Sequence, residues 1–80
     1  MNRYYTVIVT HKTYSLDEET VVHTFETYDF FKSYVVDKAG DPDVSKLRLL
    51  KTELGRVPKI TELKLSFKDN LVVFKEVLNA

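Results

Sequence analysis

The stretch DPDVSKLRLLKTELG, residues 41–55, decides how many helices this chain of 80 residues is expected to form. Asp41 suits a helix N-cap, Pro42 suits the first helical position, and Gly55 suits the end of a helix. Within it, residues 46–51, KLRLLK, begin by alternating a cation with leucine, as a half-buried strand does. The caps and the helix-forming residues favour a helix, so we predict a helix here, with a strand as the alternative.

Hydrophobic spacing predicts three elements before this stretch. Residues 3–12, RYYTVIVTHK, and residues 20–26 are rich in β-branched and aromatic side chains, which is typical of strands. Residues 28–39 carry apolar side chains at helical spacing between a capping Thr27 and Gly40. We expect Gly40 to end this helix in the left-handed conformation.

A hairpin is predicted at the end of the chain. Residues 61–68 and residues 70–78 both read as strands, and Asp69-Asn70 forms a plausible two-residue turn between them. The register set by that turn places Lys64 opposite Lys75, which is an unfavourable pair of like charges.

Length and composition predict one compact domain spanning residues 1–80. A chain of this size buries about 60–65% of its unfolded surface and does not divide that core in two. Its 44% apolar and 30% charged residues argue against disorder, and the absence of cysteine excludes disulfides and thiolate zinc sites. No apolar run approaches the ~20 residues that cross a bilayer. We therefore expect a complete, soluble, cytoplasmic protein without a cofactor.

The element order ββααββ predicts an α+β fold in which two helices cover one face of a four-stranded antiparallel sheet. The other face would meet water, yet the first and last strands place apolar side chains on it. Burying each such side chain stabilises by about 1.5–3 kcal/mol, so a contiguous uncovered set usually marks a binding surface. We predict that this set forms a homodimer interface; the alternative is that the first and last strands are neighbours under the folded loop of residues 13–19. The residues concerned are Tyr4, Ile8, Leu71, Val73 and Val77.

The charges are distributed unevenly along a chain of zero net charge. Residues 1–45 carry four Lys or Arg against eight Asp or Glu, whereas residues 46–80 carry eight against four. An acidic surface would dock on a basic protein, for example one that binds DNA. The predicted acidic surface comprises Asp17, Glu18, Glu19, Glu26, Asp29, Asp37, Asp41 and Asp43.

Nucleic-acid binding by the basic second half is the alternative function. Cations there would release counterions from a phosphate backbone. Zero net charge and a pI near 6.7 are nevertheless unusual for a nucleic-acid-binding domain. The residues of this alternative are Lys46, Arg48, Lys51, Arg56, Lys59, Lys64 and Lys68.

Residues suited to catalysis or metal binding are scarce. His11 and His23 are the two histidines, and their spacing matches no ligand motif. No serine lies in a nucleophile-elbow context, and no glycine-rich phosphate loop is present. The neighbouring carboxylates of residues 17–19 and 41–43 read more simply as a solvated loop and a helix start. We predict that the protein is not an enzyme.

Residues 21–40, VVHTFETYDFFKSYVVDKAG, combine a strand with a Thr-capped aromatic helix in a charged chain without cysteine. In this respect the chain resembles the small accessory proteins that bacteriophages express to disable host machinery. The resemblance covers about a quarter of the chain and transfers no functional residue. It implies a non-enzymatic interaction protein that inhibits a host protein by occlusion.

Overall fold

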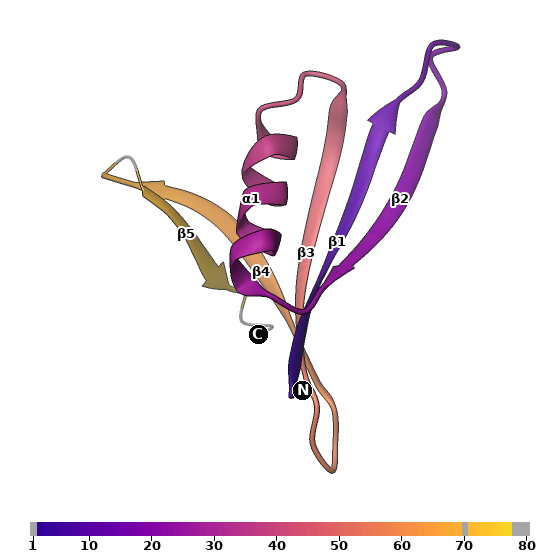
Figure 1. Cartoon of the computed structure of the whole chain (residues 1–80). Helices are drawn as coiled ribbons and strands as arrows, with labels where there is room; N and C mark the ends of the chain where they lie inside the picture. The colour runs from indigo at the N-terminus through magenta and orange to yellow at the C-terminus, as the bar shows by residue number, and fades with distance from the viewer. Residues whose placement is uncertain (1, 70, 78–80) are drawn as a thin grey trace.

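A five-stranded antiparallel sheet and one helix make up the fold over residues 2–69 and 71–77, which the computed structural model describes (Figure 1). The strands follow the order β2-β1-β3-β4-β5 across the sheet. Their bounds are β1 (Arg3–Lys12), β2 (Glu18–Phe25), α1 (Tyr28–Ala39), β3 (Val44–Glu53), β4 (Lys59–Lys68) and β5 (Leu71–Glu76).

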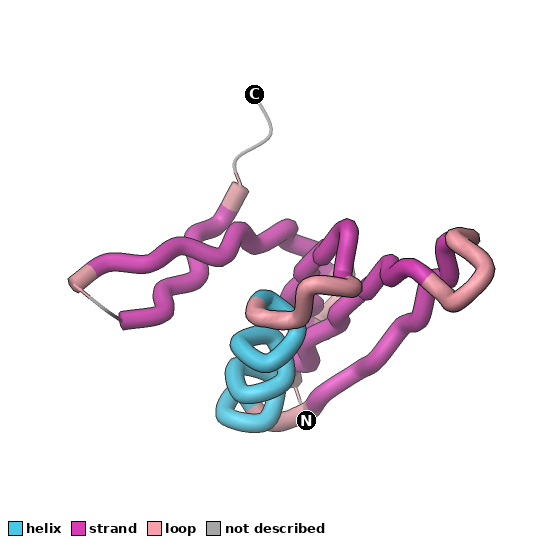
Figure 2. Tube along the Cα trace, turned by 90° about the horizontal axis from the view of Figure 1, so that it is seen from above, coloured by secondary structure: helices cyan, strands magenta, loops and turns pink. Residues whose placement is uncertain are grey.

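The helix lies on one side of the sheet (Figure 2). Both β2 and β3 pair antiparallel with β1, so they run parallel to each other, and α1 connects them. A helix in this connection brings its apolar stripe onto the sheet. The buried core comprises Tyr5, Val7, Val9, Phe31, Val35, Leu49 and Leu63.

The predicted second helix is wrong, because residues 44–53 form the strand β3. The side-chain oxygen Oδ1 of Asp41 accepts a hydrogen bond from the Asp43 N–H at 2.9 Å, and the Asp41 carbonyl accepts one from the Val44 N–H at 3.2 Å. Asp41 therefore closes a tight turn instead of capping a helix, and Pro42 fits such a turn equally well.

Pairing with β1 explains why the strand forms. Leu47 lies opposite Val9, and Leu49 lies opposite Val7, so the alternating leucines of β3 join the core. This non-local burial outweighs the helical preference of the isolated segment. The predicted fold of four strands and two helices in the order ββααββ is thus corrected to ββαβββ, and the strand alternative was right.

The other element predictions largely agree with the structure. The strand of residues 3–12 is confirmed, and β2 begins two residues before its predicted start. The helix α1 is also confirmed, although the Thr27 side chain makes no capping hydrogen bond. Gly40 has a φ of −92° and is right-handed, so the predicted left-handed helix end is wrong.

The closing hairpin has the predicted register. Lys64 lies opposite Lys75, and Leu65 lies opposite Phe74. Asp69 adopts the positive φ of 52° that the turn requires. The same register would place Leu78 opposite Thr61. Leu78 and Asn70, the second residue of the predicted turn, lie outside the described residues.

The β4–β5 hairpin leaves the plane of the other strands and extends away from α1 (Figures 1 and 2). Pairing between β3 and β4 runs from Glu53 opposite Lys59 to Leu49 opposite Leu63 and goes no further. Beyond that point β4 pairs with β5 alone, and Phe74 connects the hairpin to the core through its ring contact with Phe31 at 4.9 Å. The sheet is therefore split at one end.

Candidate interaction surfaces

The face of the sheet opposite α1, here called the open face, has no element of residues 2–69 and 71–77 packed against it (Figure 2). Successive side chains of a strand alternate between faces, so those adjacent to the core positions point to this side. The strand pairings bring these outward-pointing side chains of all five strands onto one surface. Its apolar members are Tyr4, Ile8, Val22, Leu50, Ile60, Leu71, Val73 and Val77.

The predicted self-association residues all occur on the open face, but in two groups. Tyr4 and Ile8 lie half-buried on β1, whereas Leu71 and Val73 lie on β5, with β3 and β4 between them. Leu71 is 66% exposed, so part of the apolar set is open to solvent.

The sequence prediction missed three apolar members of the open face, namely Val22 on β2 and Leu50 and Ile60 on the two intervening strands. Leu50 was not predicted because its segment was assigned to a helix, so it was not placed on any face of the sheet. The alternative arrangement is wrong, because β1 and β5 are not neighbours and the loop side chains Tyr14 and Leu16 are exposed.

The open face of β3, β4 and β5 is cationic. Four of the seven residues predicted for nucleic-acid binding lie here, and Lys75, which was not predicted, joins them. Lys51 and Lys59 point to the opposite face, and Arg56 lies in the connection between β3 and β4. Among the described residues of these strands, Glu62 is the one carboxylate on the open face. The five cations, here called the lysine strip, are Lys46, Arg48, Lys64, Lys68 and Lys75.

Two of these cations face each other directly. Lys64 and Lys75 are cross-strand partners, and both side chains are exposed. Like charges at directly opposed positions destabilise a sheet. Arg48, in contrast, is paired: its Nε lies 3.0 Å from Oε1 of Glu62. Of these cations, the Lys64 and Lys75 pair is the one best placed to gain from an anionic partner.

A groove of about 570 Å³ lies between β3 and β4, where the two strands diverge. Leu49 and Leu63 are buried at its base, whereas Leu47 and Leu65 are half-buried on its two walls. Lys46, Glu62 and Lys64 lie at its rim on the open face. A groove whose lining combines apolar and charged side chains is typical of a recognition site for a protein segment.

The helix side of the sheet carries an ionic cluster that joins β3 to β5. The Nζ atom of Lys51 lies 2.8 Å from Oε1 of Glu76 and 3.5 Å from Oε1 of Glu53. The Glu76 contact raises the pKa of Lys51, and Lys51 lowers the pKa of Glu76 in turn. The neighbouring Tyr5 side chain and the Glu53 carboxylate raise the pKa of Arg3. The contact between Lys51 and Glu76 holds the hairpin to β3, and it uses one of the seven cations that the sequence assigned to nucleic-acid binding.

The predicted acidic surface is divided between the two ends of the molecule. The Lys12 N–H donates a hydrogen bond to the Asp43 carbonyl at 2.9 Å, which brings the β1–β2 and α1–β3 connections together. Glu18 lies opposite Lys12 in the β1–β2 pairing. Glu26 and Asp29 lie at the other end, beside the first turn of α1. The carboxylates of the first end are Asp17, Glu18, Glu19, Asp37, Asp41 and Asp43.

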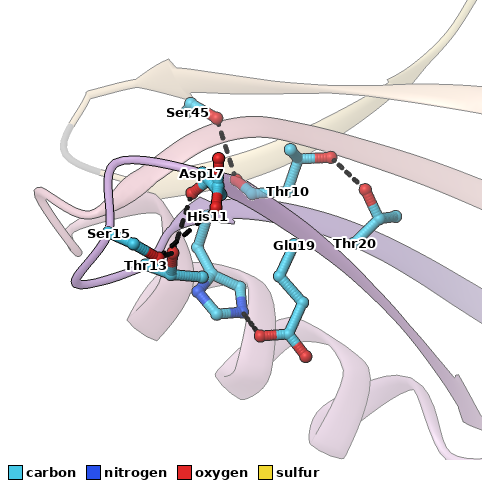
Figure 3. A network of polar contacts seen from close by, with 8 residues as sticks. All are labelled: Thr10, His11, Thr13, Ser15, Asp17, Glu19, Thr20 and Ser45. Atoms are coloured by element: carbon cyan, nitrogen blue, oxygen red, sulfur yellow. Dashed lines mark hydrogen bonds and ion pairs between the residues drawn. The ribbon is translucent and has the colours of Figure 1, made fainter.

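Polar contacts around His11 stabilise the end of the β1–β2 hairpin (Figure 3). The Nε2 atom of His11 lies 3.9 Å from Oε2 of Glu19, and the Ser15 hydroxyl donates a hydrogen bond to Oδ2 of Asp17 at 3.4 Å. His23 instead packs against the Tyr34 ring, with centroids 4.9 Å apart. The described residues include no group of three His, Cys, Asp or Glu side chains positioned to hold a metal ion.

Comparison of the chain with protein-family models, curated proteins and solved structures gave no match. No helix in the described part of the chain is both long and apolar enough to span a bilayer. The surfaces described above are therefore the basis for a functional proposal.

Proposed function

We propose that this protein is a non-enzymatic interaction domain that binds an acidic partner protein on the open face of β3, β4 and β5. The observation that carries the proposal is the combination of uncovered apolar side chains with the lysine strip on one surface. Leu71 and Ile60 are each about two-thirds exposed there. Apolar surface of this kind surrounded by charge supports a protein interface.

Charge selects the partner. Lys64 and Lys75 repel each other in the isolated chain, and an acidic surface would remove that repulsion on binding. A second copy laid face to face would instead oppose one lysine strip to another. We therefore propose an acidic protein for this face; the homodimer stays a prediction, which light scattering of the purified protein tests.

The proposal accommodates inhibition by occlusion, which the resemblance to phage accessory proteins implies. A domain that covers part of its partner blocks that surface without catalysis. The acidic end around Asp41 and Asp43 is a second surface for which docking on a basic protein stays a prediction.

Photo-crosslinking in the cell that naturally makes the protein tests the proposal. A benzophenone amino acid in place of Val73 reports on the open face, and the same group in place of Ser33 on the outer side of α1 is the control. We expect the Val73 probe, and not the Ser33 probe, to capture an acidic protein. Equal capture from both positions, or capture of a second copy of this chain alone, contradicts the proposal.

Nucleic-acid binding is the second candidate function, favoured by the presence of four of its predicted residues on the open face. Single-stranded nucleic acids require aromatic side chains for base stacking as well as cations. Tyr4 is the one aromatic residue on the described open face, which is why we rank this function second. Binding of generic single-stranded DNA that weakens steeply with salt and is lost in Lys64→Glu supports it; no binding at low salt removes it.

A further inference from the structure

We infer that the partner contributes an extended segment that pairs with the free edge of β3, inside the groove between β3 and β4, and that acidic and apolar side chains alternate along it. The inference rests on the proposed function and names the part of the partner that is recognised.

The free edge is the first observation. Residues 44–48 of β3 pair with β1 on one side. On the other side the pairing with β4 starts at Leu49, and residues 45–48 make no other backbone hydrogen bond among the described residues. An unpaired edge offers a row of N–H and C=O groups, which an added strand satisfies. Four residues of free edge are enough for a short strand.

Repulsion between cations would oppose closure of the sheet at this point. If the register of β3 and β4 continued beyond Leu49 and Leu63, Arg48 would lie opposite Lys64. Lys64 already faces Lys75 on its other side, so closure would place three cations in one row. Like charges at opposed positions oppose pairing, and the strands diverge here. An inserted strand with an acidic side chain at this level would separate the cations and neutralise them.

The walls of the groove specify the alternation. On the helix side, Leu47 of β3 and Leu65 of β4 are half-buried and face the same space. On the open-face side, Lys46 and Lys64 line the groove, and the Glu62 carboxylate beside them is already paired with Arg48. Because side chains of a strand alternate between the two faces, a segment added to β3 points every second residue at the leucines and the others at the lysines. The groove therefore favours a bound segment in which acidic and apolar side chains alternate.

The two outer edges of the sheet, on β2 and β5, lack this combination, and no residue of β5 lines the groove between β3 and β4. The free edge of β2 begins with Glu18 and Glu19, whose charges oppose an acidic segment. The groove at the base of the molecule, about 400 Å³, is lined by Arg3, Glu26 and Glu53 and offers no free strand edge. The β3 edge is therefore the site with matching backbone, charge and apolar contacts.

A synthetic peptide about seven residues long, in which valine and glutamate alternate, tests the inference. Amide hydrogen exchange measured by NMR on the full chain reports which backbone groups it protects. We expect new protection at alternate amides within residues 45–48, because the other amides already face β1, together with chemical-shift changes at Leu47 and Leu65 and no added protection in β2. A peptide with lysine in place of glutamate is expected to bind at least tenfold more weakly.

Charge reversal in the groove supplies the matched variant. Lys46→Glu combined with Lys64→Glu is expected to weaken the glutamate peptide at least tenfold and to strengthen the lysine peptide. Lys32→Glu, on the outer side of α1, makes a charge reversal away from the groove and is expected to leave both affinities unchanged. A swap of peptide preference cannot result from unfolding, since an unfolded variant loses both peptides.

Three results would overturn the inference: no binding of the glutamate peptide, equal binding of both peptides, or protection at β2 or β5 instead of β3. Binding of single-stranded DNA at residues 45–48 in place of the peptide would also overturn it and assign the groove to nucleic acid. Failure here is distinguishable from failure of the proposed function. If the Val73 probe still captures an acidic protein, the open face binds that protein without strand addition.

Discussion

The β1–β2–α1–β3 part of the molecule and the β4–β5 hairpin use the same kind of alternating sequence, but one has a covering layer and the other largely does not. Val7 and Phe31 are fully buried in the first part. In the hairpin, Phe67 on the helix side and Leu71 on the open face are both about two-thirds exposed. The comparison teaches that the helix is long enough to cover three strands, so the remaining strands keep surface for a partner.

The largest expected effect separates these two parts by stability. Phe31→Ala removes a fully buried ring that stacks on Tyr5 at 4.7 Å, and we expect a loss of about 3–5 kcal/mol in the free energy of unfolding. Phe67→Ala in the hairpin makes the same chemical change at an exposed position and is expected to change it by less than about 0.5 kcal/mol. Urea denaturation followed by circular dichroism measures both; similar losses in the two variants would contradict the comparison.

The next effect concerns binding. Leu71 on the open face and Phe30 on the outer side of α1 are almost equally exposed, at 66% and 69%. Leu71→Asp is expected to reduce the partner captured by the Val73 probe at least tenfold, because it places an anion where an acidic, apolar surface docks. Phe30→Asp is the matched control and is expected to leave capture unchanged. Equal losses in the two variants would show that exposure alone, and not the open face, determines binding.

A smaller effect, an increase in stability, is expected when the Lys64 and Lys75 repulsion is removed. Lys64→Glu turns the Lys64 and Lys75 pair into an ion pair, and we expect the free energy of unfolding to rise by about 0.2–1 kcal/mol. Lys64→Gln removes the repulsion alone and should fall between the variant and the parent chain. Thermal unfolding at low salt measures the series. A fall in stability in Lys64→Glu would remove the claim that this pair opposes the isolated fold.

The smallest effect is a change in pH dependence. Because Lys51 lowers the pKa of Glu76, their contact stabilises the fold above the ordinary glutamate pKa and is lost as the pH falls through the lowered value. The pKa of Lys51 is raised, so on the alkaline side the contribution is present below the ordinary lysine pKa and is lost as the pH rises through the raised value. Glu76→Gln is expected to flatten the acid side of the stability profile. An unchanged profile would show that this contact does not hold the hairpin.

Local sequence signals were sufficient for β1, the helix and the register of the closing hairpin. In each of these elements the spacing of apolar residues and the residues at the ends indicate the same structure. Asp69, for example, has the positive φ that suits the predicted turn. They were insufficient for residues 41–55, because Asp-Pro-Asp serves both as a helix start and as a tight turn. The outcome depends on Leu47 and Leu49 packing beside β1, which is a non-local contact. The local sequence of residues 41–55 alone does not predict that contact.

The same error limited the prediction of the site. With a helix assigned to residues 41–55, Leu50, Lys46 and Arg48 had no place on a sheet face, although the two cations were included in the nucleic-acid alternative. Lys75 was noted only as an unfavourable neighbour of Lys64. The groove was not predictable either, since it arises where β4 leaves β3, a feature of tertiary geometry. Apolar residues on β5 were predicted, because their period is visible in the sequence.

The uncovered state of the open face in the isolated chain is the central claim, and methyl NMR with a soluble paramagnetic agent measures it directly. We expect the methyl signals of Leu71, Val73 and Val77 to broaden strongly in the dilute protein, while those of Val7 and Val35 stay sharp. Protection of Leu71 and Val73 equal to that of Val7 would contradict the account, because the face would then already be covered without a partner.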